Sequence, residues 1–84
     1  MITAGQVKAS RALLGIDQRK LAKVAGLSLP TIQRMEASGG VIRGNVDSLM
    51  KLIAALDALG IELMSDNAVS PGGGRGVRLK RPAA

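Results

Sequence analysis

Apolar residues recur at helical spacing through about the first 60 residues of the chain and alternate with polar residues after them. The spacing predicts four helices: Thr3 to about Leu14, Gln18 to Ala25, Leu29 to Ala37 and Val46 to Leu59. The strongest pattern lies in the fourth helix, where apolar residues fall at i, i+3, i+4, i+7 and i+10. These residues are Val46, Leu49, Met50, Ile53 and Leu56.

Residues suited to helix ends flank the predicted helices. Each helix starts at a polar residue whose side chain can cap it, and Gln6 stands at capping-box spacing from the first cap. The caps are Thr3, Asp17, Ser28 and Asn45. Glycines at positions 15, 26 and 60 can adopt the left-handed conformation that ends a helix. Pro30 falls in the first turn of the third helix, where its missing N–H costs nothing.

After position 60 the spacing of apolar residues changes from the helical period to every second residue. Residues 61–63 and 77–80 alternate apolar and polar side chains, which predicts two short strands. Between them lies the stretch 67–76, which contains Pro71 and three consecutive glycines and favours a flexible loop. An isolated hairpin is marginal in water, so these strands should pack on the helices or pair with a second subunit. The predicted fold is mainly α: a bundle of four helices with a short C-terminal β-hairpin or strand pair.

Composition narrows the chemistry of this chain. It has 84 residues, no aromatic residue, no Cys and no His, so its core must be aliphatic and thiolate metal sites are excluded. Its formal net charge is +6, with a net +4 over residues 1–36, −2 over 37–66 and +4 over 67–84. Such a basic balance points to nucleic acid or another anionic surface. No apolar run is long enough to span a membrane, so we expect a cytoplasmic protein.

The stretch from residue 17 to 36 combines two short predicted helices with a Gly-containing turn. Ala22 offers a small residue at a helix crossing, Gly26 follows four positions later at the turn, and Ile32 is an apolar anchor six positions beyond. This spacing fits a helix-turn-helix unit, but it fits any helical hairpin with an Ala contact about equally well.

Several segments together resemble the Cro/phage-repressor (XRE) family of helix-turn-helix proteins, over about residues 3–60. The similar positions are Gln6 to Arg11, Leu14 to Gln18, Leu21-Ala22, Ala25 to Ser28, Thr31-Ile32 and Met35-Glu36. The resemblance implies a DNA-binding domain at residues 1–60. The alternating pattern beyond it predicts that residues 61–84 form a C-terminal strand pair with a Gly-rich loop and a basic tail, and this tail departs from the family. The resemblance also implies that the helix from about Leu29 to Ala37 lies in the major groove of DNA.

The resemblance implies roles for individual residues. In the family's pattern, the residue matching Gln18 opens the second helix and contacts a DNA phosphate. The residues matching Arg11 and Glu36 form an ion pair. Base contacts are expected from exposed residues of the third helix, above all from Arg34, which can donate two hydrogen bonds to guanine. The full expected base-contact set is Leu29, Pro30, Gln33 and Arg34. The expected phosphate contacts are Gln18, Arg19, Ser28, Thr31 and Arg43. Leu29 and Pro30 depart from the family, which usually has polar residues there.

Three function classes follow from these observations. The first is a sequence-specific transcriptional regulator of repressor type that binds double-stranded DNA as a homodimer, joined through residues 61–80, at an inverted repeat. The alternative is an antitoxin or anti-activator type of interaction protein that binds a protein partner through its C-terminal region. An enzyme is the least favoured class, because the acidic residues suit helix capping, ion pairing and solvation and form no nucleophile–base pair. We expect no cofactor and no metal.

Overall fold

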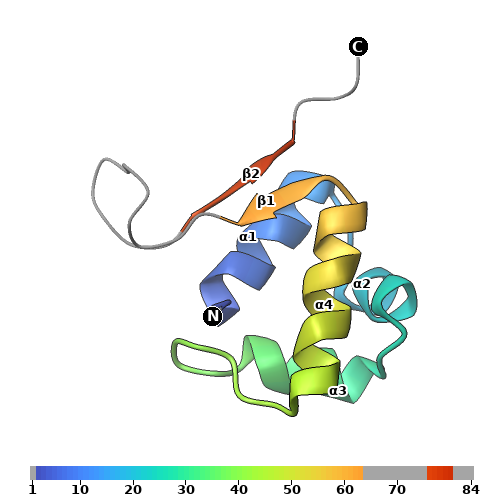
Figure 1. Cartoon of the computed structure of the whole chain (residues 1–84), viewed down its shortest axis with the longest axis vertical. Coiled ribbons are helices and arrows are strands. Elements are labelled where there is room, and N and C mark those ends of the chain that lie inside the picture. Colours follow the sequence, from blue (N-terminus) through green and yellow to red (C-terminus); the bar gives the residue numbers. More distant parts are fainter. Residues whose placement is uncertain (1, 64–75, 81–84) are drawn as a thin grey trace.

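The computed structural model describes residues 2–63 and 76–80, and the predicted helices and strands are present in it (Figure 1). Their bounds are α1 Ala4–Leu14, α2 Gln18–Ala25, α3 Leu29–Glu36, α4 Val46–Ala58, β1 Ile61–Leu63 and β2 Val77–Leu79. The mainly helical fold class with a C-terminal strand pair is therefore confirmed. Most of the predicted 67–76 loop, including Pro71 and its glycines, lies outside the described residues, as do Arg75 and Arg81 of the basic tail.

Helix ends lie close to where the caps and glycines predict them. Each N-cap side chain accepts the backbone N–H three residues later, as in the 2.7 Å bond from Lys20 N to Asp17 Oδ1. Gly15 and Gly26 end α1 and α2 in the left-handed conformation, at φ 68° and 69°. The third and fourth helices end one residue earlier than predicted, since Ala37 and Leu59 serve as C-caps.

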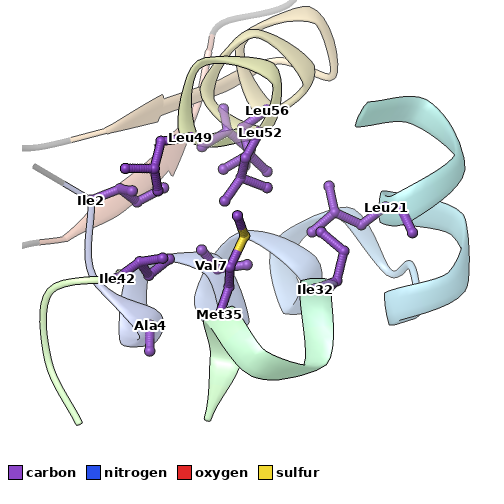
Figure 2. Packing of buried hydrophobic residues seen from close by; sticks show 12 residues of the cluster. Ile2, Ala4, Val7, Leu21, Ile32, Met35, Ile42, Leu49, Leu52 and Leu56 are labelled. Atoms are coloured by element: carbon purple, nitrogen blue, oxygen red, sulfur yellow. The ribbon is translucent and has the colours of Figure 1, made fainter. Parts of the chain in front are cut away.

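An aliphatic core lies between the helices (Figure 2). Leucines of α4 point toward Val7 of α1 and Met35 of α3, and Leu21 of α2 lies beside Ile32 of α3. The fully buried large apolar side chains are Val7, Leu21, Ile32, Leu52, Leu56 and Ile61. Burying one such side chain contributes about 1.5–3 kcal/mol, so this cluster supplies the main stabilising term of the fold.

The fourth helix shows one difference from the sequence pattern. Of the periodic residues, Leu49 and Leu56 are buried, whereas Val46 and Met50 are 71% and 65% exposed. The buried face of α4 is completed by Leu52 and by Ala55. Apolar residues occupy more than one side of α4, and only one side can face α1, α2 and β1. The spacing predicted the helix correctly but not which of its apolar residues are buried.

The two strands form an antiparallel sheet at the end of the molecule away from α3 (Figure 1). β1 packs against α4 and β2 against α1, with Ile61 buried in the shared core. Gln6 of α1 donates from Nε2 to the Gly76 carbonyl at 3.1 Å, and Lys80 pairs with Asp57 of α4. The sheet therefore packs on the helices, one of the two arrangements that the sequence left open.

Candidate nucleic-acid interface

The second and third helices pack against each other across a short turn. Ala22 is buried where α2 meets the core, and the Leu27 N–H donates to the Ala22 carbonyl at 2.9 Å across the left-handed Gly26. Ile32 anchors α3 in the core with no exposed surface. The three spaced positions therefore hold two eight-residue helices in a helix-turn-helix arrangement.

The outer side of α3 presents most of the predicted base-contacting residues. Pro30, Gln33 and Arg34 are exposed, while Met35 and Glu36 face the interior. Leu29, an expected base contact, and Thr31, an expected phosphate contact, are only partly exposed. The surface available to a ligand is therefore centred on Gln33 and Arg34, with Pro30 beside them.

Hydroxyl groups connect the start of α3 to Arg34. Thr31 N donates to the capping Ser28 Oγ at 3.2 Å, and the two hydroxyl oxygens lie 2.8 Å apart. The guanidinium of Arg34 donates from Nη2 to Thr31 Oγ1 at 3.4 Å. This long, solvent-exposed bond orients the guanidinium along the helix surface and is weak enough to be exchanged for a stronger acceptor.

Arg43 lies near Arg34 although the two are nine positions apart in the sequence. Both side chains line one shallow pocket together with Thr31, Asn45 and Ser48, at the junction of α3, the following loop and the start of α4. Arg43 is exposed, and no acidic residue lines this pocket. The sequence predicted a basic residue in the loop after α3 but did not show that it would share a surface with Arg34.

The start of α2 adds further positive charge. Arg19, Lys20 and Lys23 are exposed, and α2 itself contains no acidic residue, only the Asp17 that caps it. At the start of α2, Lys20 N and Leu21 N already donate to Asp17, so only the first backbone N–H groups of this helix remain for an anion. Arg19, an expected phosphate contact, is exposed on this basic helix.

The expected ion pair between Arg11 and Glu36 is present and is bidentate. Arg11 Nε and Nη2 each donate to a different Glu36 carboxylate oxygen, both at 2.6 Å. Glu36 is only 4% exposed, and its hydrogen bonds to Arg11 raise the pKa of that guanidinium against the opposing effect of burial. The pair joins α1 to the last residue of α3 and so holds α3 in place.

Gln18 joins this pair, a role that the sequence analysis did not predict. Its Nε2 donates to Glu36 Oε1 at 3.2 Å, and the side chain is half-buried. The only sequence feature that could have indicated it is the placement of Gln18 at the start of α2, one turn from the end of α1. Glu36 of α3 thereby accepts hydrogen bonds from two other helices, α1 and α2.

Other kinds of site find little support in residues 2–63 and 76–80. This part of the chain holds no group of three or more Asp, Glu, His or Cys side chains that could bind a metal ion. None of its helices is long and apolar enough to cross a membrane. No known protein family and no curated protein matches the chain in sequence.

Proposed function

We propose that the protein binds double-stranded DNA with the outer side of α3 and acts as a sequence-specific transcriptional regulator of repressor type. The observation that supports this most is the surface shared by Arg34 and Arg43, two exposed guanidinium groups with hydroxyl and amide neighbours and no acid among them. Rigid attachment of α3 through Glu36 adds to it, because groove recognition requires a fixed helix. The resemblance of residues 3–60 to the Cro/phage-repressor family also favours DNA binding.

In this proposal α3 lies in the major groove. Arg34 exchanges its weak bond to Thr31 for two hydrogen bonds to guanine, and Gln33 pairs with adenine or with a phosphate. Pro30 and the exposed part of Leu29 offer only apolar contact, which suits a thymine methyl group. Direct recognition of sequence therefore depends mainly on Arg34.

Phosphate contacts would surround this helix. Arg19 on α2 and Arg43 in the loop after α3 are exposed cations, and the hydroxyls of Ser28 and Thr31 stand at the N-terminus of α3. The side-chain amide of Gln18 already donates to Glu36, so the phosphate near Gln18 is better met by the backbone N–H groups at the start of α2. Gln18 then couples the position of α3 to the phosphate contact of α2.

Selection from a pool of random duplex DNA tests the proposal. We expect enrichment of an inverted repeat with half-sites about one helical turn apart, and an affinity that falls steeply as salt rises. Arg34→Ala should weaken binding by about 1–3 kcal/mol and relax preference at one base pair. Arg78→Ala removes the same charge from the sheet at the far end of the molecule and is the matched control. Equal losses in both variants, or no enrichment, would contradict the proposal.

The second candidate is the interaction protein that binds a partner through the C-terminal sheet. Hydrogen-bonded pairs alternate in an antiparallel ladder, and Lys80 N donates to the Gly60 carbonyl. The backbone groups of Val77 and Leu79 therefore point to the outer edge of β2, where a partner strand could add. Arg78 and Lys80 favour an acidic strand. Co-purification of a stoichiometric partner from the native host, lost on deletion of β2, would support this candidate.

A further inference from the structure

The loop of residues 39–44, which follows α3, is paired with the residues that precede α1. Residues 2–4 run antiparallel to residues 40–42, and Thr3 and Val41 form a β-bridge between the two segments. Thr3 and Val41 are a non-hydrogen-bonded pair, because their chain neighbours make the two bonds of the bridge. Segments that are far apart in the sequence therefore meet beside the proposed recognition surface.

Two backbone hydrogen bonds close this bridge. Ala4 N donates to the Gly40 carbonyl oxygen at 2.9 Å, and Ile42 N donates to the Ile2 carbonyl oxygen at 3.1 Å. Within the described part of the chain, the loop makes no other backbone hydrogen bond. The second bond lies one residue before Arg43, so the bridge fixes the backbone from which that side chain extends.

Buried side chains hold the bridge in place. Ile2 and Ile42 are each 3% exposed, and Figure 2 shows them with Ala4 at the same edge of the core. The buried Gln6 accepts a hydrogen bond from Thr3 N at 2.9 Å through its Oε1. The segment before α1 is therefore attached both to the core and to the helix that follows it, and it can support the loop rigidly.

We propose that residues 2–4 position Arg43 for DNA, and that they do so through the hydrogen bond from Ala4 N to Gly40. The inference rests on the proposed function, in which Arg43 contacts a phosphate. Arg43 is exposed and makes no hydrogen bond or ion pair within the described residues, so its own side chain does not fix its place. A loop that is already ordered loses less conformational entropy on binding, which raises affinity.

The bridge acts on DNA only through Arg43. Ile2 and Ala4 are almost completely buried and offer DNA no surface of their own, so they are positioning residues. If the bridge only stabilised the fold, breaking it would change DNA affinity equally with and without the Arg43 side chain. If it positions Arg43, breaking it changes affinity only while that side chain is present.

Ala4→Pro removes the N–H that donates to Gly40. Ala4 is the first residue of α1, where proline fits a helix, and Thr3 before it is extended at φ −106° and ψ 160°, as the residue before a proline must be. Ala4→Val is the matched control, because it also enlarges the side chain at this buried position but keeps the N–H. Circular dichroism checks that both variants are folded. We expect Ala4→Pro to bind the selected duplex severalfold more weakly than Ala4→Val does.

A double-mutant cycle with Arg43→Ala separates positioning from stability. In the Arg43→Ala background, Ala4→Pro and Ala4→Val should bind the duplex equally, because the contact that the bridge positions is gone. The same loss from Ala4→Pro with and without the Arg43 side chain would overturn the proposal.

Hydrogen exchange of the free protein tests the positioning without DNA. The wild-type Ile42 amide should exchange much more slowly than the amide of Arg43, which has no acceptor among the described residues. Ala4→Pro should speed up exchange at Ile42 relative to Ala4→Val. A wild-type Ile42 amide that exchanges as fast as that of Arg43 would also overturn the proposal. If the exchange differences are found but the wild type has no duplex affinity, the bridge holds the loop as inferred and the proposed function fails.

Discussion

Two Arg–Glu pairs in this protein have the same chemistry but lie in different surroundings. Arg11 and Glu36 meet through two hydrogen bonds of 2.6 Å, and Arg78 and Glu62 through two of 3.0 and 2.9 Å, each as a fork on a carboxylate. Glu36 is 4% exposed, whereas the Glu62 side chain is 46% exposed. The two pairs therefore separate the effect of burial from the effect of hydrogen-bond geometry.

Because of burial, the first pair should contribute strongly to the stability of the fold, and the exposed second pair should contribute almost nothing. The Glu36 carboxylate is almost cut off from water and depends on its partners, while Arg11 is 22% exposed, so the first pair is costly to break. At the surface, water replaces the lost partner and salt screens the charges, so a pair of the same geometry contributes little. The two carboxylates also connect different numbers of elements. Glu36 joins three helices, whereas Glu62 joins only the two strands.

The largest expected effect comes from removing the buried carboxylate. Glu36→Ala should lower the free energy of unfolding by about 3 kcal/mol, the lower end for a buried pair, because Arg11 loses its partner and stays charged but is 22% exposed to water. Urea unfolding followed by far-UV circular dichroism measures this. The matched control is Glu62→Ala, which should be close to wild type. Similar losses in the two variants would show that burial does not distinguish the pairs.

A smaller effect is expected at the third member of the buried group. Gln18→Ala should cost about 1 kcal/mol, because Glu36 keeps both bonds from Arg11 and loses only the amide of α2. In the Glu36→Ala background the same substitution should cost much less, and a double-mutant cycle of unfolding free energies measures this coupling. Strictly additive losses would indicate that the 3.2 Å bond contributes nothing to stability.

The smallest effect is expected at Glu62 and depends on pH. The hydrogen bonds from Arg78 lower the pKa of Glu62 below its ordinary value, so the folded state favours the carboxylate. A depressed pKa stabilises the fold above the ordinary carboxyl range, and this contribution disappears as pH falls through the lowered value. The Tm difference between wild type and Glu62→Gln should therefore be small at neutral pH and vanish in acid. A difference that grows as pH falls would contradict this sign.

Local chemistry made the secondary structure predictable. The caps Thr3, Asp17, Ser28 and Asn45 and the glycines at helix ends act within three or four residues, so sequence alone located the helices to within one residue. The outward direction of Val46 and Met50 was not predictable in this way. It depends on which side of α4 meets the other helices, and that is decided by packing between distant segments.

The candidate site was predictable to a similar extent. Arg34 and Gln33 were expected on the outer side of α3, and they are exposed there. The closeness of Arg43 to Arg34 and the bond from Gln18 to Glu36 depend on tertiary contacts that no spacing in the sequence reveals. The ion pair of Arg11 and Glu36 joins residues 25 positions apart, so no local pattern could predict it. The resemblance to a known family did.

The proposed recognition helix and its neighbour are each only eight residues long. A free peptide needs about 12–15 residues before a helix is even marginally stable in water, so α2 and α3 exist because Leu21 and Ile32 are buried in the aliphatic core. The surface that these two helices form consequently melts together with the rest of the domain and has no independent folded state. A temperature-sensitive lesion anywhere in that core would silence the protein abruptly, at the temperature where the whole domain unfolds.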